Sequence, residues 1–259
     1  IWGYDMTTAI AKIEIYATTS SWLRSFSGDG YAAATQSTTC INSLLWDMIP
    51  ESDVRKGWWI DEDLKSPLID DLTWPGCDGD LAHADDGGAA KLPFLPYTNV
   101  KFGCSTVGTT TNDEDMPLIR VEEMYLLEAE AVGMSQGVAA GVEKLNSFMT
   151  TYRDPEYHCA LSDARAFQLE VLTQERIEFW GEGNAFPNAK RLRPGTIQNY
   201  DGTNAPADIF KINCKGIKPN WNFVIPDKET QSNQELNNPD PAATVTGPTP
   251  VGEFAPGKF

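Results

Sequence analysis

The chain has 259 residues, 41% of them hydrophobic, which is enough to build the core of one large domain or two small ones. Its formal net charge of −17 argues against nucleic acid as a partner and against attachment to an anionic membrane by charge alone. No apolar run approaches the roughly 20 residues of a membrane-spanning helix.

The sequence opens on Ile1 without an initiator methionine or a signal peptide. We therefore expect a processed or truncated piece, with any export signal or anchor upstream. The five cysteines show no metal-binding spacing, and an odd number cannot all pair within one chain. One or two disulfides fit the pattern as well as buried free thiols do. The cysteines are Cys40, Cys77, Cys104, Cys159 and Cys214.

Residues 1–115 form a loop-rich, aromatic-rich region. Short helices are expected near 38–49, and short strands around 56–61 and 97–102. Aromatic side chains on loops can offer flat platforms to sugar rings, so this region is the predicted ligand-binding part. The candidate ligand-binding residues are Trp22, Phe26, Tyr31 and Trp74, with burial in the core as the alternative for each. Burial is favoured for the other tryptophans considered, which are Trp46, Trp58, Trp59, Trp180 and Trp221.

Residues 116–239 form a helical region. The stretch MPLIRVEEMYLLEAEAVG is apolar on most sides, so we expect a helix with Pro117 in its first turn, buried on several sides. Apolar residues then recur at steps of 4, 3, 4 and 3, which predicts an amphipathic helix. Those residues are Val138, Val142, Leu145, Met149 and Tyr152. The short MSQG link makes the two helices an antiparallel hairpin.

A third helix is expected from Ser162-Asp163 to about Trp180. Glu175 and Arg176 fall on its apolar face, whereas Glu170 and Glu178 fall outside it. Buried charges must be paired, so Glu175 and Arg176 are predicted to connect helices, with Arg120 or Glu122 as partners. The alternative is a catalytic pair of carboxylates for glycoside cleavage, which the inward-facing geometry disfavours.

Successive helix hairpins indicate a tetratricopeptide-like array. After residue 193 the chain returns to loops, and residues 240–259 are expected to form an extended tail rich in proline and glycine. The fold class predicted is mainly α, with an irregular loop-rich region and few short strands.

Four blocks of sequence resemble the SusD/RagB-like outer-membrane glycan-binding lipoproteins of Bacteroidetes, in their C-terminal part. The blocks are MPLIRVEEMYLLEAEA, GVEKLNSFMTTYR, LTQERIEFWGEGNAFPNAKRL and FVIPDKETQSNQELNNP. Upstream, SDVRKGWWI and LPYTNVKFG resemble further segments of the family. The chain departs from the pattern at Asn184-Ala185, where the family has His-Arg, and at Pro187-Asn188, where it has an aromatic residue followed by Asp.

The resemblance implies non-catalytic binding of an oligosaccharide or polysaccharide at the bacterial cell surface. It also implies delivery to a SusC-like TonB-dependent transporter in the outer membrane, and a lipid anchor that is absent from this chain. A peptide-binding member of the same family is the first alternative. A glycoside hydrolase that uses acidic loop residues and a helix-repeat adaptor are the others.

No cofactor is predicted. Asp78, Asp80, Asp85 and Asp86 could gather a calcium ion, but their spacing fits no standard loop, and a solvated acidic loop is favoured. His83 and His158 have no partners at zinc-binding spacing. The sequence also lacks a glycine-rich phosphate loop and the GxSxG motif of serine esterases.

Overall fold

The computed structural model describes residues 2–4, 40–63, 65–67, 95–99, 101, 116–214, 225–233 and 235–236. The predicted tail at 240–259 and Trp221 lie outside these residues. The chain divides into two compact units, Ile1–Gly183 and Asn184–Phe259. The region boundaries predicted at residues 115 and 239 concern loop content and remain predictions.

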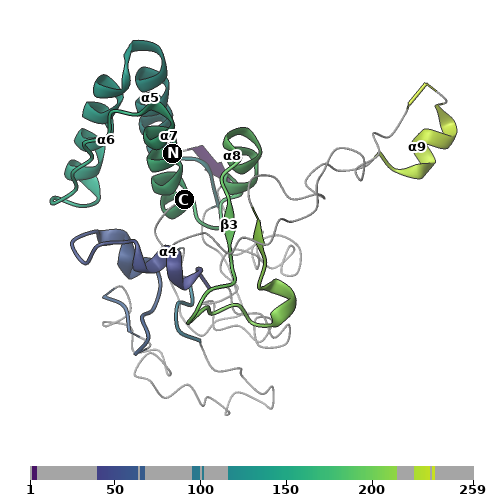
Figure 1. Cartoon of the computed structure of the whole chain (residues 1–259), viewed down its shortest axis with the longest axis horizontal. Helices are drawn as coiled ribbons and strands as arrows, with labels where there is room; N and C mark the ends of the chain where they lie inside the picture. Colours follow the sequence, from purple (N-terminus) through teal and green to yellow (C-terminus); the bar gives the residue numbers. More distant parts are fainter. Residues whose placement is uncertain are drawn as a thin grey trace. The chain divides into compact units, whose positions relative to one another are not determined.

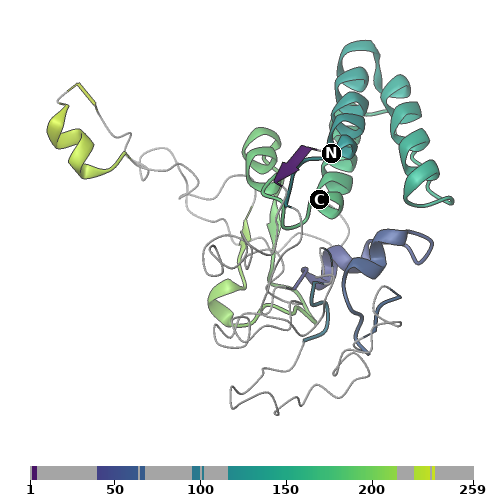
Figure 2. The same cartoon turned by 180° about the vertical axis from the view of Figure 1, so that it is seen from behind.

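Three helices form the main body of the first unit. They are α5 (Val121–Gln136), α6 (Val138–Tyr152) and α7 (Ala164–Glu178). α5 packs on both α6 and α7, and Figures 1 and 2 show α5 and α6 side by side. Only Gly137 separates α5 from α6. Its φ is 111°, a backbone conformation that residues other than glycine rarely adopt. The predicted hairpin is confirmed, with a link shorter than the four residues expected.

α5 and α6 pack through glycine. A Cβ atom added at Gly141 would lie 2.6 Å from Cα of Gly133 and 2.7 Å from the carbonyl oxygen of Ala129. This close approach lets one apolar core form among the three helices. The core consists of Leu126, Ala129, Leu145, Phe148, Met149, Cys159, Phe167, Val171 and Phe179. Cys159, in this core, is a free thiol.

α7 begins where the sequence predicts. Asp163 is its N-cap, and the side chain of Asp163 accepts a hydrogen bond from the backbone nitrogen of Ala166 at 2.8 Å. The helix ends at Glu178, two residues before the predicted end.

The residues before α5 form a strand, so the prediction that the helix includes Pro117 is wrong. β2 (Met116–Ile119) pairs in antiparallel fashion with β1 (Trp2–Tyr4), and Gly3 lies opposite Pro117. Arg120 has an extended backbone, and the helix starts after it. Proline is compatible with an edge strand as well as with a first helical turn, so pairing with a distant segment decides between them.

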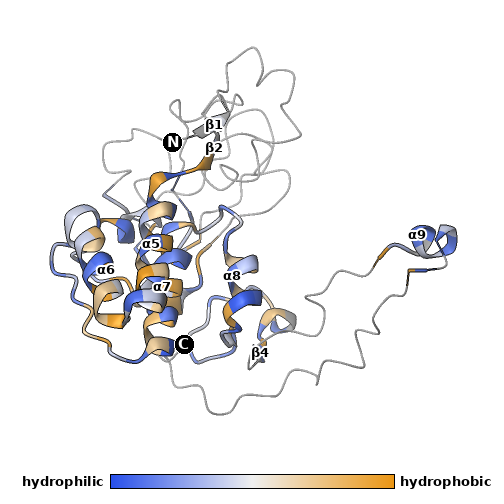
Figure 3. Cartoon of the chain, turned by 90° about the horizontal axis from the view of Figure 1, so that it is seen from above, coloured by the Kyte–Doolittle hydropathy of each residue, from blue (hydrophilic) through white to orange (hydrophobic). Residues whose placement is uncertain are grey.

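The prediction that α5 is buried on several sides is also wrong for one of those sides. Met124, Leu127 and Met134 are 41–49% exposed. Figure 3 shows hydrophobic residues along β2 and α5.

The segments upstream of β2 contribute a second apolar cluster to the first unit. It contains α4 (Ser43–Asp47) and a 3-10 helix, η1 (Val54–Trp58). The strands expected around 56–61 and 97–102 are single antiparallel bridges, Trp59 with Asn99 and Cys40 with Thr98. The buried members of this cluster are Ile41, Leu45, Ile49, Trp59, Tyr97 and Ile177. Ile177 belongs to α7, so this cluster connects the upstream segments to the helical body.

The second unit contains short elements. They are α8 (Ala185–Leu192), β3 (Thr196–Ile197), the 3-10 helix η2 (Asp208–Phe210), β4 (Asn213–Cys214) and α9 (Asp227–Ser232). β3 pairs with β4 in antiparallel fashion. The fold is therefore mainly α with few short strands, as predicted. Within the residues that the structure describes, no helix is both long enough and apolar enough to cross a membrane.

Candidate functional site

The four aromatic residues predicted to bind ligand, Trp22, Phe26, Tyr31 and Trp74, lie outside the described residues, so their assignment remains a prediction. The acidic residues 78–86 considered for calcium also lie outside. In the part of the chain that is described, no three His, Cys, Asp or Glu side chains are grouped to hold a metal ion.

The described residues instead show a buried group of charges in the first unit, here named the ionic cluster. It contains four carboxylates and four cations that form ion pairs with one another. Its members are Asp53, Arg55, Lys101, Arg120, Glu122, Arg153, Glu178 and Glu182. The cluster is therefore electrically balanced, in a chain with a net charge of −17.

Glu178 occupies the centre of the ionic cluster, and its side chain is fully buried. Arg153 binds both of its carboxylate oxygens, with Nε at 2.8 Å and Nη2 at 2.9 Å. Arg120 Nη1 donates to the same carboxylate at 3.0 Å, and Arg55 Nη1 lies 3.5 Å from it. Burial by itself would raise the pKa of Glu178, but Arg153, Arg55 and Arg120 together hold that pKa below its usual value.

Glu182 is the second acceptor of the cluster. Arg120 binds it in a bidentate manner, with Nε and Nη2 each 2.9 Å from a carboxylate oxygen. The same guanidinium also donates to the backbone carbonyl of Glu178 at 2.8 Å and lies over the Phe179 ring at 4.9 Å. Arg120 thus connects the start of α5 to the end of α7 and the turn that follows.

Lys101 brings an upstream segment to the same turn. Its ammonium donates to Glu182 Oε1 at 2.6 Å and to the carbonyl of Glu178, and it lies 4.7 Å from the centre of the Trp58 ring. Only 6% of the side chain is exposed. Burial lowers the pKa of Lys101 to about 8, against the opposing effect of Glu182.

Arg55 is the fully buried cation that fixes η1. Its guanidinium binds both oxygens of Asp53, the N-cap of η1, and its Nη2 donates to Gln174 Oε1 on α7. The backbone nitrogen of Val54 also donates to the carbonyl of Arg153 at 2.9 Å. Residues 53–55 are therefore joined to both α6 and α7.

The ionic cluster indicates that Glu178 and Glu182, at the end of α7 and in the turn after it, have a structural role. A carboxylate surrounded by three guanidinium groups, with a lowered pKa, cannot serve as a general acid near neutral pH. The expectation that Glu178 lies outside the buried face is wrong, because that face was defined by apolar side chains alone. Arg120, expected to pair near Glu175, binds Glu178 and Glu182. Glu175 is 4% exposed and Arg176 is half-buried, and their structural role remains a prediction.

Trp46, Trp58, Trp59 and Trp180 pack into the second apolar cluster. Trp59 is 1% exposed, and its ring meets the Trp180 ring edge-on at 5.6 Å. Trp46 and Trp58 are half-buried and pack against the same cluster. Lys56 lies over the Trp46 ring at 4.3 Å, so a cation already covers one face of that ring. These positions agree with the expectation that packing is the role of Trp46, Trp58, Trp59 and Trp180.

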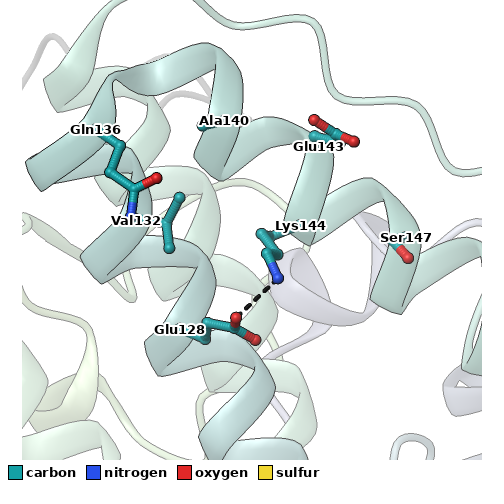
Figure 4. Close-up of a pocket in the computed structure, with 7 residues that line it drawn as sticks. All are labelled: Glu128, Val132, Gln136, Ala140, Glu143, Lys144 and Ser147. Atoms are coloured by element: carbon teal, nitrogen blue, oxygen red, sulfur yellow. Dashed lines mark ion pairs between the residues drawn. The ribbon is translucent and has the colours of Figure 1, made fainter.

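A groove of about 470 Å³ also lies between α5 and α6. Figure 4 shows an ion pair across it, in which Lys144 Nζ lies 2.8 Å from Glu128 Oε1. Val132 and Ala140 are its apolar lining, and Gln136, Glu143 and Ser147 make the rest of the lining polar. Because the ion pair between Lys144 and Glu128 crosses the groove, we interpret the groove as a polar contact between two helices and not as a ligand site.

The model of the SusD family matches residues 93–247 of this chain, which is more than half of its length. The chain belongs to the SusD family. The match covers α5, α6 and α7 and six of the eight members of the ionic cluster, all except Asp53 and Arg55. Members of this family are non-catalytic binding proteins, which supports the prediction that the chain is not an enzyme.

A solved structure of a SusD-like carbohydrate binding protein from Bacteroides vulgatus resembles the chain with a TM-score of 0.58 at 20% sequence identity. The likeness covers 91% of this chain and 48% of the other. The chain thus spans about half the length of that SusD-like protein, and at this identity the likeness establishes the fold. No curated protein matches the chain.

Sequence reasoning from periodicity missed most of the ionic cluster. Arg55, Lys101, Arg153 and Glu182 were not predicted to form buried ion pairs, and Glu178 was placed on the wrong side of its helix. The available signal was the family resemblance, since all five lie within the segments that carry it: SDVRKGWWI, LPYTNVKFG, GVEKLNSFMTTYR and LTQERIEFWGEGNAFPNAKRL.

Proposed function

We propose that the chain is part of a surface protein that captures an oligosaccharide or polysaccharide without cleaving it. The bound glycan would pass to a TonB-dependent transporter of the SusC type in the outer membrane, and the protein would be held at that membrane by an N-terminal lipid. The observation that carries this proposal is membership in the SusD family, together with a structural relative described as a carbohydrate binding protein.

The ionic cluster gives this proposal a physical basis. Binding by stacking needs aromatic side chains on loops whose ends are held in fixed positions. Asp53 and Arg55 join the chain before residues 56–100 to α6 and α7, and Lys101 joins the chain after them to the turn that follows α7. The segment with the candidate Trp74 runs between these two attachments. A buried, hydrogen-bonded cluster is well suited to such positioning because its geometry is specific.

The experiment is affinity gel electrophoresis of the protein through a panel of polysaccharides, with Trp22→Ala and Trp74→Ala beside it. We expect one polysaccharide to retard the protein, and the retardation to be lost in at least one of the two variants. Stacking of a base on one aromatic ring is worth on the order of 1–3 kcal/mol, and a similar contribution for a sugar ring would make the loss about fivefold or more in affinity. Phe210→Ala is the matched control, because Phe210 is 54% exposed and lies in the other unit.

Three outcomes would count against this assignment. Retardation that persists in both tryptophan variants would show that Trp22 and Trp74 are not needed for binding, while it would still support a glycan as the ligand. No retardation by any polysaccharide would favour the peptide-binding alternative, for which the net charge of −17 predicts cationic peptides as ligands. Release of reducing sugar from any member of the panel would show an enzyme instead.

A further inference from the structure

Tyr97 has a backbone conformation that large side chains rarely adopt. Its φ is 70°, in the left-handed region. Residues 95–98 form a turn closed by a 3.1 Å hydrogen bond from the backbone nitrogen of Thr98 to the carbonyl of Leu95. Because Pro96 is second and the positive φ is third, the turn is of type II, which favours glycine or asparagine in the third position. The tyrosine at that position is therefore strained.

The end of a helix does not explain this strain. Among the described residues other than glycine, only Arg193 shares a positive φ. Arg193 follows the last turn of α8, and a left-handed residue commonly ends a helix. Tyr97 ends no helix. Strain of this kind persists only where the surrounding structure determines the conformation, and it is concentrated at ligand sites and switches. The strain therefore indicates a role for the tyrosine side chain that glycine could not fill.

Contacts on three sides hold Tyr97 in place. Its backbone nitrogen donates to the carbonyl of Ile60 at 2.8 Å, and its own carbonyl accepts from the nitrogen of Ile41 at 3.0 Å. Its ring meets the Trp46 ring edge-on at 5.3 Å, and only 8% of the residue is exposed. Its hydroxyl donates to Glu62 Oε1 at 2.7 Å, across 35 positions of sequence. The turn thus directs a buried aromatic side chain onto one carboxylate.

Glu62 lies in a turn of its own. The nitrogen of Asp61 donates to the carbonyl of Lys65 at 2.8 Å, and the nitrogen of Lys65 donates to Asp61 Oδ1 at 2.8 Å. The hydrogen bond between Tyr97 and Glu62, here named the clasp, therefore joins a turn at residues 61–65 to a turn at residues 95–98. Residues 66–94, which include the candidate Trp74, run from the first turn to the second.

We propose that Tyr97 is a positioning residue for ligand binding, because the clasp holds the two ends of residues 66–94 together and so determines where Trp74 is presented. This inference rests on the proposed function, in which Trp74 contacts the glycan. A segment whose ends are fixed loses less entropy when it binds a ligand, so it binds more tightly. Glycine in the turn would relax the backbone but has no side chain to reach Glu62, which accounts for a strained tyrosine there.

The test uses conservative variants of the full-length protein in affinity gel electrophoresis. Tyr97→Phe keeps the ring against Trp46 and removes only the hydroxyl, whereas Glu62→Ala removes the acceptor. Each variant should bind the polysaccharide about three- to tenfold more weakly, the effect of one lost hydrogen bond. Tm should fall by no more than about 4 °C, so that the protein stays folded during the assay.

Three further variants separate the clasp from other effects. The double variant should lose no more affinity than either single variant, because both remove the same contact. Glu62→Gln keeps an acceptor oxygen and should bind as wild type does. Asp63→Ala is the matched control, since Asp63 is an exposed carboxylate next to Glu62, and it should also bind as wild type does.

Trypsin provides a readout that needs no ligand. Lys91 is the only lysine or arginine within residues 66–94. When the clasp is removed, cleavage after Lys91 should be about threefold faster or more, because the segment opens more often. Cleavage in Asp63→Ala should proceed at the rate of wild type.

Different results would overturn this inference and the proposed function. Faster cleavage with wild-type affinity would show that the clasp orders the segment without positioning a ligand contact. Loss of affinity in Tyr97→Phe but not in Glu62→Ala would mean that the hydroxyl contacts the ligand itself. Binding that Trp74→Ala abolishes and the clasp variants leave intact would contradict this inference alone. Absence of binding by the wild-type protein would contradict the proposed function, and this inference with it.

Discussion

At the scale of single residues, Glu178 shows how a charge can be buried without becoming reactive. It has no exposed side-chain surface, and it lies within reach of three guanidinium groups. Removing one partner of a buried ion pair generally costs about 3–5 kcal/mol, because the remaining charges lose their counter-charge while they stay out of water. In this case a single substitution leaves Arg55, Arg120 and Arg153 short of one anion.

We therefore predict that Glu178→Gln lowers the free energy of unfolding by about 3–5 kcal/mol at pH 7. Because the pKa of Glu178 is lowered in the folded state, its stabilising contribution is present above its unfolded pKa of about 4.3. The contribution is lost as the pH falls through the lowered folded-state pKa. Urea unfolding followed by circular dichroism between pH 7 and pH 3 should thus show the wild-type and variant curves converging in acid.

Glu156→Gln is the matched control, since Glu156 is exposed, and its substitution should change stability by less than about 0.5 kcal/mol. A difference between wild type and Glu178→Gln that stays constant down to pH 3 would mean that the carboxylate is not stabilised by the arginines.

The same residue marks a limit of sequence-based prediction. The periodicity of α7 predicts its apolar face, and Leu172, Val171 and Phe179 are indeed buried. Periodicity carries no information about cations 25, 58 or 123 positions away, and those three, Arg153, Arg120 and Arg55, determine that Glu178 is buried. Partners at such separations are set by the tertiary fold, so a buried charge looks like a surface charge in a single sequence.

At the scale of elements, local signals located the helices well. Spacing of apolar residues predicted α6, and an Asp at the right position predicted the start of α7. The failure at Met116–Ile119 has a different cause, since its partner strand is Trp2–Tyr4, more than a hundred residues earlier. A strand that exists only through such pairing has no local signature that separates it from a first helical turn.

The contact between α5 and α6 leads to a prediction about glycine. Gly141→Ala should destabilise the protein, although alanine favours a helix by about 1 kcal/mol relative to glycine. The added methyl group would lie 2.6–2.7 Å from backbone atoms of α5, which cannot move aside as a flexible side chain would. We expect a net loss of about 1–3 kcal/mol, typical of overpacked cores, measured by urea unfolding.

Ala139→Gly, on the exposed side of α6, measures the difference in helix propensity between alanine and glycine without a change in packing. It should lower the free energy of unfolding by about 1 kcal/mol. If Gly141→Ala proved more stable than wild type, the two helices would have to lie further apart than the structure places them.

At the scale of the whole molecule, the sequence predicts the family and the fold class but not the binding surface. The match over residues 93–247 covers the helices, whose packing is repetitive and therefore recognisable. The candidate ligand residues Trp22, Phe26, Tyr31 and Trp74 lie upstream of that match and outside the described residues. Loops that bind ligand follow no period, so only the type of side chain, and not its position, could be used to predict them.

The last prediction concerns net charge, because salt affects the charges at the surface and the charges in the interior differently. The ionic cluster is balanced and buried, whereas the chain as a whole carries −17. Salt screens exposed charges over about 10 Å at 0.1 M and affects buried pairs much less. Raising sodium chloride from 20 to 500 mM at pH 7 should therefore raise Tm by relieving repulsion among surface carboxylates, while the cluster keeps its contribution.

At pH 4.4, near the isoelectric point, the net charge vanishes and the effect of salt on Tm should largely disappear. Scanning fluorimetry over both series measures this directly, and a Tm that falls with salt at pH 7 would mean that salt weakens exposed ion pairs by more than it relieves repulsion among surface carboxylates.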